Sequence, residues 1–282
     1  MALQKEIWLS DLKEQPLPDT SFVFASEDKS EYVDNNTLHL QEAGIEPAVH
    51  ENFFDGNANG ELPIAGIDDI PHEVSLNIYS SEVTRHRNLE EVELAYNKRQ
   101  SIIGRHRTGI NKALAARAAF AWTPSATNAH NKLIKLGATD SVIDAVTDLR
   151  AFYMDLDKNE QLNLVLTSAH WAAIKKEDKK LYKELMAEKS KNYGDFKIHM
   201  YSQAPLFTSA GVKKPFGAAQ AAGDTRGSFA WVSNEVFRCF GDVEMYINEK
   251  QARIQADLIS FGQRALVGNI RATSPKYLGA II

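Results

Sequence analysis

Residues 89–121 read LEEVELAYNKRQSIIGRHRTGINKALAARAAFA, and this stretch decides the fold. Its apolar residues recur at spacings of 4, 7, 7 and 4, which places one apolar stripe along a long α-helix. About 30 residues at about 1.5 Å each predict a rod of about 45 Å. Thr123-Pro124 predicts the end of the helix, because proline disfavours helical backbone in the residue before it. The stripe consists of Val92, Tyr96, Ile103, Ile110 and Leu114.

The charges are sorted along the chain. The 282 residues carry a net charge of −5, but residues 1–91 hold 5 lysines and arginines against 19 aspartates and glutamates, a net charge of −14. Residues 92–282 hold 27 against 18, a net charge of +9, and the predicted helix is itself basic. One interpretation is that the acidic first third lies on a basic surface of the same chain or of an identical neighbour. The other is that these charges serve solubility alone.

The residues before the helix have the pattern of an extended arm followed by a projecting loop. In residues 1–52, short apolar groups are separated by charges and prolines, which predicts an arm that docks piecemeal on another surface. Residues 53–85 contain the turn-favouring stretch DGNANG at 55–60 and then alternate polar and apolar residues over 72–79. We expect a long β-hairpin here, covered by a partner surface, because exposed apolar hairpins aggregate.

The residues after the helix mix helical and strand patterns and predict an α+β fold. A helix is expected at 139–154, with Thr139 or Asp140 as its N-cap. A second helix is expected from a Ser168 N-cap to about Lys189. Gly241 opens a predicted β-hairpin whose turn is 248–251. Single strands are expected at 162–166, 196–200 and 228–232.

No motif supports catalysis. Residues 155–159, DLDKN, open like a calcium loop, but the required later glycine and glutamate are replaced by Glu160 and Leu166. The histidines have no zinc-site spacing, and no phosphate loop or nucleophile elbow occurs. The single Cys239 excludes an internal disulfide, and no apolar run approaches the roughly 18 residues of a membrane span. We predict a soluble intracellular protein without catalytic, cofactor-binding or metal-binding residues, which is not an enzyme.

The order of arm, long hairpin, long helix, α/β unit and second hairpin resembles one known family. It is similar to that of the major capsid proteins of tailed double-stranded DNA bacteriophages, which have the Hong Kong 97-like fold. Residues 91–101, EVELAYNKRQS, resemble the start of that family's spine helix, and residues 164–171, LVLTSAHW, resemble the entry to its axial domain. The stretch from Gly241 to Gly262 resembles its peripheral β elements. The resemblance covers nearly the whole chain and rests on the order of elements.

The resemblance implies a domain arrangement. Residues 1–52 would form an N-terminal arm, and residues 53–85 would form an extended loop that lies across a neighbouring subunit. Residues 86–150 and 241–282 would form the peripheral domain, with the spine helix at 89–121. Residues 151–240 would form the axial domain.

The resemblance also implies a function. The chain would self-assemble into hexamers and pentamers of an icosahedral head that encloses double-stranded DNA without sequence-specific binding. It would be part of the virion capsid and would assemble in the host cytoplasm, without a cofactor or a membrane. Portal, scaffolding and decoration proteins are the further candidate partners. One alternative is an encapsulin-type nanocompartment shell, which shares the fold, and a second is an enzyme with an unrecognised active site.

The arm, the loop and the helix are the predicted subunit interface. Some relatives cross-link subunits through a loop lysine, but this chain has no lysine between Lys29 and Lys98. Noncovalent contacts between the acidic loop and the basic helix of a neighbour are therefore expected. The candidate interface residues are Trp8, Phe22, Phe24, Glu61, Leu62, Ile64, Ile67, Asp68, Asp69, Arg99, Arg105 and Arg107.

Overall fold

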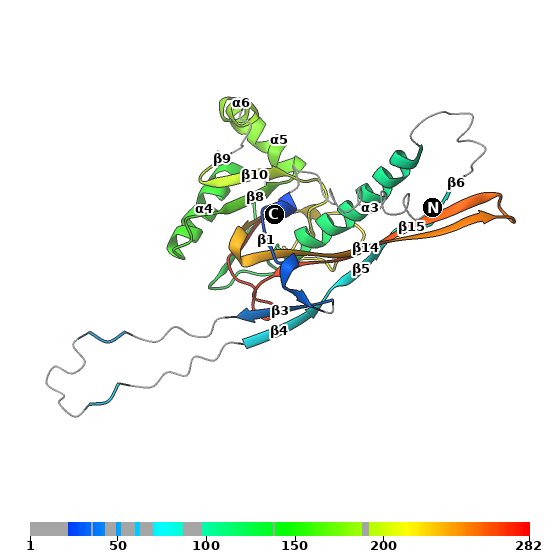
Figure 1. Ribbon diagram of the computed structural model, residues 1–282. Coiled ribbons are helices and arrows are strands. Elements are labelled where there is room, and N and C mark those ends of the chain that lie inside the picture. The colour runs from blue at the N-terminus through cyan, green and yellow to red at the C-terminus, as the bar shows by residue number, and fades with distance from the viewer. Residues whose placement is uncertain are drawn as a thin grey trace.

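The computed structural model describes residues 22–34, 36–42, 49–51, 60–62, 70–86, 98–137, 139–187 and 192–282. An α/β unit occupies one end of the molecule, and a long helix on a long β-hairpin extends from it (Figure 1). Beyond a small sheet, residues 49–51 and 60–62, the described part of a projecting loop, lie away from both (Figure 1). The helices and sheets are mixed along the chain, which confirms the predicted α+β class.

The long helix α3 spans Lys98–Ala121. Its buried residues Ile103, Ile110 and Leu114 belong to the predicted apolar stripe and pack against the long hairpin. The helix ends where Thr123-Pro124 predicted, and the Thr123 hydroxyl donates a hydrogen bond of 2.6 Å to the carbonyl oxygen of Ala119. The predicted start at residue 89 lies outside the described residues.

Strands β14 (Val236–Gln251) and β15 (Ala256–Asn269) form the hairpin beneath α3. The prediction of a start at Gly241 and a turn at 248–251 was wrong at both points. Strand β14 continues past both predicted limits. Bulges between Phe240 and Val243 and between Asn248 and Gln251 break the side-chain alternation, so the alternating pattern in the sequence is shorter than the strand. Gly241 lies at the first bulge, where a Cβ atom would come within 2.9 Å of the Leu76 side chain.

The other strands of this sheet come from the N-terminal third of the chain. The order is β1–β14–β15–β5, and β6 also pairs with β15. The alternating stretch over 72–79 does not form one strand, because it is interrupted at Leu76, whose side chain is buried against the hairpin. The first part pairs within a separate sheet of order β2–β3–β4. The strands are β1 (Glu27–Asp28), β2 (Val33–Asp34), β3 (Thr37–Glu42), β4 (Ile70–Ser75), β5 (Asn77–Ser80) and β6 (Thr84–His86).

The α/β unit is built on a six-stranded sheet of order β7–β16–β13–β8–β10–β9. Its central strand β8 is fully buried, and the strands predicted at 162–166, 196–200 and 228–232 are confirmed. Two further strands pair antiparallel at the base of a nearby loop. The sheet strands are β7 (Asn131–Ile134), β8 (Leu162–Leu166), β9 (Asn192–Tyr193), β10 (Phe196–Met200), β13 (Ser228–Val232) and β16 (Leu278–Ile281), and the loop strands are β11 (Leu206–Phe207) and β12 (Thr225–Arg226).

Three helices cover this sheet, and their ends differ from the predicted ones. The N-cap of α4 (Val142–Asp155) is Ser141, whose hydroxyl accepts a hydrogen bond of 2.9 Å from the amide of Asp144. Thr167, not Ser168, is the N-cap of α5 (Ser168–Glu177). The single helix predicted to run to about Lys189 is two helices, because Asp178 is extended and α6 (Lys179–Ala187) begins after it.

The strand pairing requires a correction to the predicted domain limits. Strand β7, helix α4 and strand β16 belong to the α/β unit, although their residues fall within the ranges 86–150 and 241–282. The C-terminal residues pair between β7 and β13, so the unit draws on the chain on both sides of 151–240. Strand β3 pairs with β4, so the stem of the projecting loop begins at Thr37, within the residues assigned to the arm.

Candidate assembly surfaces

The projecting loop is held to the body by a short antiparallel stem. Strands β3 and β4 pair from Thr37 opposite Ser75 to Glu42 opposite Ile70. Leu38 and Leu40 are buried against Phe237 of the hairpin and its neighbours, which fixes the direction of the stem. Beyond the stem, residues 49–51 and 60–62 lie away from the body (Figure 1).

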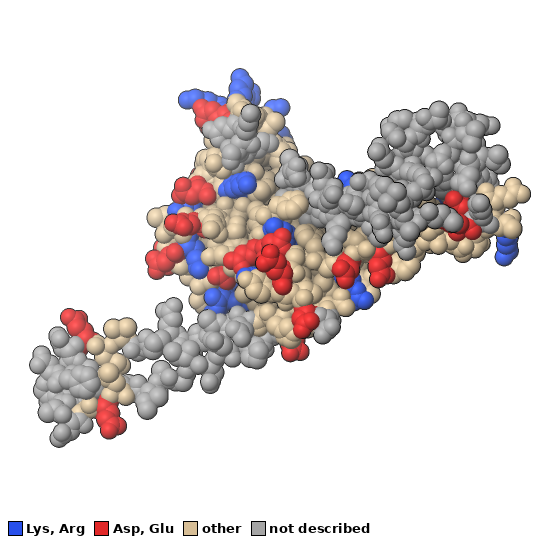
Figure 2. Space-filling model, viewed as in Figure 1, with Lys and Arg blue, Asp and Glu red and all other residues tan. Residues whose placement is uncertain are grey.

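The described outer part of the loop consists of residues 49–51 and 60–62. Val49 is 96% exposed and Leu62 is 48% exposed, so neither contributes to the core of this chain. Glu51 and Glu61 are also exposed, and acidic side chains mark both pieces in Figure 2. Apolar and acidic side chains therefore stand together far from the body. The predicted interface residues Trp8, Ile64, Ile67, Asp68 and Asp69 lie outside the described residues.

Helix α3 offers a surface of opposite charge. Residues 98–121 contain six lysines and arginines and no acidic residue. Arg105 and Lys112 are exposed, whereas Arg107 is half-buried and has an interaction partner within the chain. The side chain of Arg99 lies outside the described part of the helix.

A groove of about 900 Å³ runs between α3 and the β5–β6 segment. Tyr79 and Ile110 are among the apolar side chains that line it, and Arg85 and Arg105 are its basic ones. One wall is fixed by a polar contact that sequence patterns did not reveal. The Thr84 hydroxyl donates to the carbonyl oxygen of Ile259 at 3.2 Å, so it accepts from Nε2 of His106 at 3.0 Å. Burial lowers the pKa of His106, which favours its neutral form.

Phe22, one of the predicted interface residues, is part of this chain's own core. Its side chain is 3% exposed and lies edge-on to the rings of Trp122 and Phe229, at centroid distances of 5.8 and 5.6 Å. Phe22 is therefore an intramolecular anchor within the predicted arm. No local pattern distinguishes this aromatic residue from one that contacts a neighbour.

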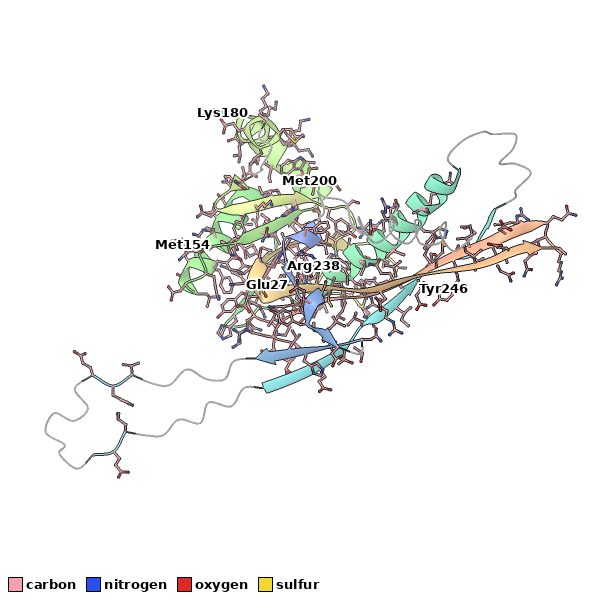
Figure 3. The ribbon with its side chains drawn as sticks, viewed as in Figure 1. Glu27, Met154, Lys180, Met200, Arg238 and Tyr246 are labelled. Atoms are coloured by element: carbon pink, nitrogen blue, oxygen red, sulfur yellow. The ribbon has the colours of Figure 1, made fainter. Side chains whose placement is uncertain are left out.

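Arg238 holds the same segment in place (Figure 3). Its guanidinium donates to the carbonyl oxygens of Phe24 and Ser26 and forms an ion pair of 3.1 Å with Asp28. It also lies 5.3 Å from the centroid of the Phe24 ring. Phe24 is half-buried by these contacts, so it too serves the chain's own structure.

Lys213 joins a loop of the α/β unit to the end of α3. Its ammonium donates hydrogen bonds of 2.6 Å to the carbonyl oxygens of Phe120 and Thr123, and it lies 4.0 Å from the centroid of the Phe120 ring. Burial lowers the pKa of Lys213 to about 8. The cation therefore caps the C-terminal end of the helix, where free carbonyl groups favour positive charge.

Two half-buried histidines of the α/β unit, His170 and His199, have structural partners. Nδ1 of His170 lies 2.7 Å from the hydroxyl of Ser228, which also accepts from the amide of Thr167 at 3.0 Å. Ser228 is completely buried, so this serine–histidine pair offers no accessible nucleophile. Nε2 of His199 lies 3.3 Å from Oδ1 of Asn163, and burial lowers the pKa of His199 to about 4.

Metal and thiol chemistry gain no support in the described ranges. Among these residues, no group of three or more histidine, cysteine, aspartate or glutamate side chains is placed to hold a metal ion. Cys239 is buried, and burial raises the pKa of its thiol to about 11. No helix in the described part of the chain is both long and apolar enough to span a membrane.

Comparison with known proteins places the fold. No family model and no curated protein sequence matches the chain. The capsid of Ralstonia phage GP4 is similar in structure, with a TM-score of 0.60, 11% identity, and coverage of 95% of this chain and 89% of that one. The capsid of a native GTA particle has a TM-score of 0.63 at 13% identity, covering 94% and 90%. A virus-like particle from Pyrococcus furiosus has a TM-score of 0.61 at 10% identity and covers 99% of both chains. The chain has the predicted Hong Kong 97-like capsid fold.

Proposed function

We propose that this chain, which has the fold of phage capsid proteins, is the major capsid protein of a tailed double-stranded DNA phage and serves a structural role rather than a catalytic one. The observation that carries the proposal is the likeness to capsid structures over at least 93% of this chain. The projecting loop, whose exposed apolar side chains the chain itself does not cover, supports a subunit that is completed by neighbours.

In this proposal the α/β unit is the axial domain, and α3 with the β14–β15 hairpin is the peripheral domain. Hexamers and pentamers would close an icosahedral head around DNA in the host cytoplasm. Portal, scaffolding and decoration proteins would be further partners. The DNA would be contained rather than read, because a chain with a net charge of −5 is a weak phosphate ligand.

The loop of one subunit would lie across the basic helix of the next. Exposed Glu61 and Leu62 offer an acidic and an apolar contact, and exposed Arg105 beside the groove offers their complement. Each exposed ion pair contributes only about 0–1 kcal/mol. Repeated at every subunit contact of a shell, these pairs would determine how neighbouring subunits align more than how tightly they bind. Assembly should therefore weaken as salt screens the charges. If assembly is unchanged between low salt and about 1 M, the electrostatic part of the proposal is wrong.

The test of the function is electron microscopy of the purified recombinant chain. Closed shells, or rings of five and six subunits, are the expected result. Monodisperse monomers under every salt condition would contradict the proposal, and turnover of a substrate by those monomers would favour an enzyme.

An encapsulin-type compartment remains the second candidate, because the match to the Pyrococcus furiosus virus-like particle covers 99% of both chains. The contents of particles from the native source discriminate between the two. Packaged double-stranded DNA supports a phage head, whereas an enclosed enzyme without genomic DNA supports a compartment.

A further inference from the structure

Helices α5 and α6 carry a dense group of exposed lysines. Residues 175–187 hold five lysines against three acidic residues, a net charge of +2 in a chain whose net charge is −5. Figure 2 shows lysine and arginine side chains gathered at the top of the view, where α6 lies in Figure 1, and Lys180 stands there in Figure 3. All five lysines are exposed, and we call them the lysine tip: Lys175, Lys176, Lys179, Lys180 and Lys183.

The acidic residues next to the lysine tip do not pair with it. The carboxylate of Glu177 accepts a hydrogen bond from the hydroxyl of Ser141. The carboxylate of Asp178 accepts from the amides of Lys180 and Leu181 at 2.8 and 3.1 Å, which caps the start of α6. Among the described residues, no ion pair involves an ammonium group of the lysine tip. The positive charge is therefore available to a partner.

The placement of these lysines is unfavourable in an isolated chain. Lys179 and Lys180 occupy the first turn of α6, where the helix dipole favours negative charge and no acidic residue is present. Lys179 and Lys183 are four residues apart on the helix, and like charges at this spacing destabilise it. Buried Leu185 lies on the opposite side of α6, so the lysines face outward. A polyanion bound to them would offset both penalties.

We propose that the lysine tip binds the phosphate backbone of double-stranded DNA without reading its sequence. The inference rests on the proposed function, in which a closed head holds such DNA. Lysine is a flexible point charge, so its ammonium group can follow phosphates without a fixed geometry. Residues 175–187 contain no arginine, asparagine or glutamine, the side chains that most often read base edges.

The composition of the tip favours duplex DNA over other acidic partners. Protein–protein interfaces are depleted in lysine and enriched in arginine, whereas this surface has lysine alone. Single-stranded nucleic acid needs exposed aromatic rings on which its bases stack. The one aromatic residue of 175–187, Tyr182, is half-buried, with its ring 5.6 Å from that of Trp171 and 5.3 Å from the ammonium of Lys175. The tip therefore offers charge and no stacking surface.

The experiment measures binding of a fluorescent DNA duplex to the full-length chain by anisotropy. The unassembled fraction is isolated by size exclusion, so that every face of the subunit is accessible. In the double variant Lys179→Gln and Lys183→Gln, binding at about 50 mM salt should weaken by about tenfold or more, because two phosphate contacts are lost. The slope of log K against log salt should fall by about 2, and by the same amount for duplexes of different sequence.

Two further variants isolate the position and the charge of the lysines. Lys197→Gln with Arg253→Gln removes the same charge from exposed residues outside the tip, and binding should stay close to that of the wild type. Lys179→Arg with Lys183→Arg keeps the charge and should retain binding. Equal weakening by the tip and control variants would overturn the proposal, as would a wild-type chain that does not bind the duplex. Weaker self-association of the tip variant with unchanged duplex binding would overturn it in favour of an acidic surface on a second copy.

Duplex binding and shell formation are separate readouts. Electron microscopy of the same preparations records whether rings or shells form. Shells from a chain whose subunits show no binding through the lysine tip would overturn this inference alone. Binding through the tip by a chain that never forms rings or shells would support the DNA contact and contradict the capsid function.

Discussion

The indole nitrogen of Trp231 donates a hydrogen bond of 2.8 Å to the carbonyl oxygen of Ala25, a residue 206 positions earlier in the chain. Trp231 lies on β13 in the α/β unit, and its ring is also packed near Trp122, which follows α3. This contact therefore ties the N-terminal segment to the junction between the α/β unit and the long helix. The segment is part of the fold rather than only an appendage for a neighbour.

The first prediction concerns Phe22, which fills this junction. Phe22→Ala should lower the free energy of unfolding of the subunit by about 3–5 kcal/mol, because it leaves a cavity among aromatic rings. Urea denaturation measures the loss. Tyr32→Ala is the matched control, since Tyr32 belongs to the same segment but is 64% exposed, and its effect should be within about 0.5 kcal/mol. Equal effects of the two substitutions would mean that Phe22 is not a core residue.

The second prediction concerns the cap that Lys213 places on α3. Lys213→Met should cost about 1–3 kcal/mol of stability, because the carbonyl groups of Phe120 and Thr123 lose a donor in a largely buried place. Exposed Lys180 provides the control, and Lys180→Met should leave the unfolding curve nearly unchanged. If the two variants unfold alike, the capping role is wrong.

The third prediction concerns pH. The pKa of His199 is lowered from 6.5 to about 4 by burial, so the unfolded chain binds a proton more readily than the folded one. The contribution of His199 is fully present above about pH 6.5 and declines as the pH falls toward 4, by at most about 3 kcal/mol. The difference in unfolding free energy between wild type and His199→Gln, followed from pH 8 to 4.5, isolates this residue from titrating carboxylates. A difference that does not change with pH would contradict the assignment.

Sequence patterns predicted the helices and strands that are determined by residues close together in the chain. The Ile103–Leu114 stripe, the end of α3 before Pro124 and the buried strand β8 all follow from residues a few positions apart. The helix caps were misplaced by one or two residues, because several adjacent residues could accept the same backbone hydrogen bond. The predicted β14 was too short because its limits were taken from the side-chain alternation, which the bulges reverse.

The long-range contacts had no local signal. Nothing near Leu278–Ile281 indicates that this strand pairs between β7 and β13. In the sequence, Arg238 is indistinguishable from any other arginine in a strand. Its partners Phe24 and Asp28 lie more than 200 residues earlier and contact it only in the folded chain. The uneven charge distribution along the chain did predict the loop and the helix as contact surfaces. Glu61 and Arg105 are both exposed in the structure. Their contact across two subunits stays a prediction.

The central claim is that the projecting loop completes a shell, and deletion of residues 56–69, which spares β4, tests it most directly. The wild-type chain and the deletion variant would be compared by sedimentation velocity and electron microscopy. Circular dichroism and urea unfolding would check that the variant subunit is folded. The account predicts large closed particles from the wild type, and folded subunits or small oligomers that never close from the variant. Normal closed shells from a folded variant would contradict it.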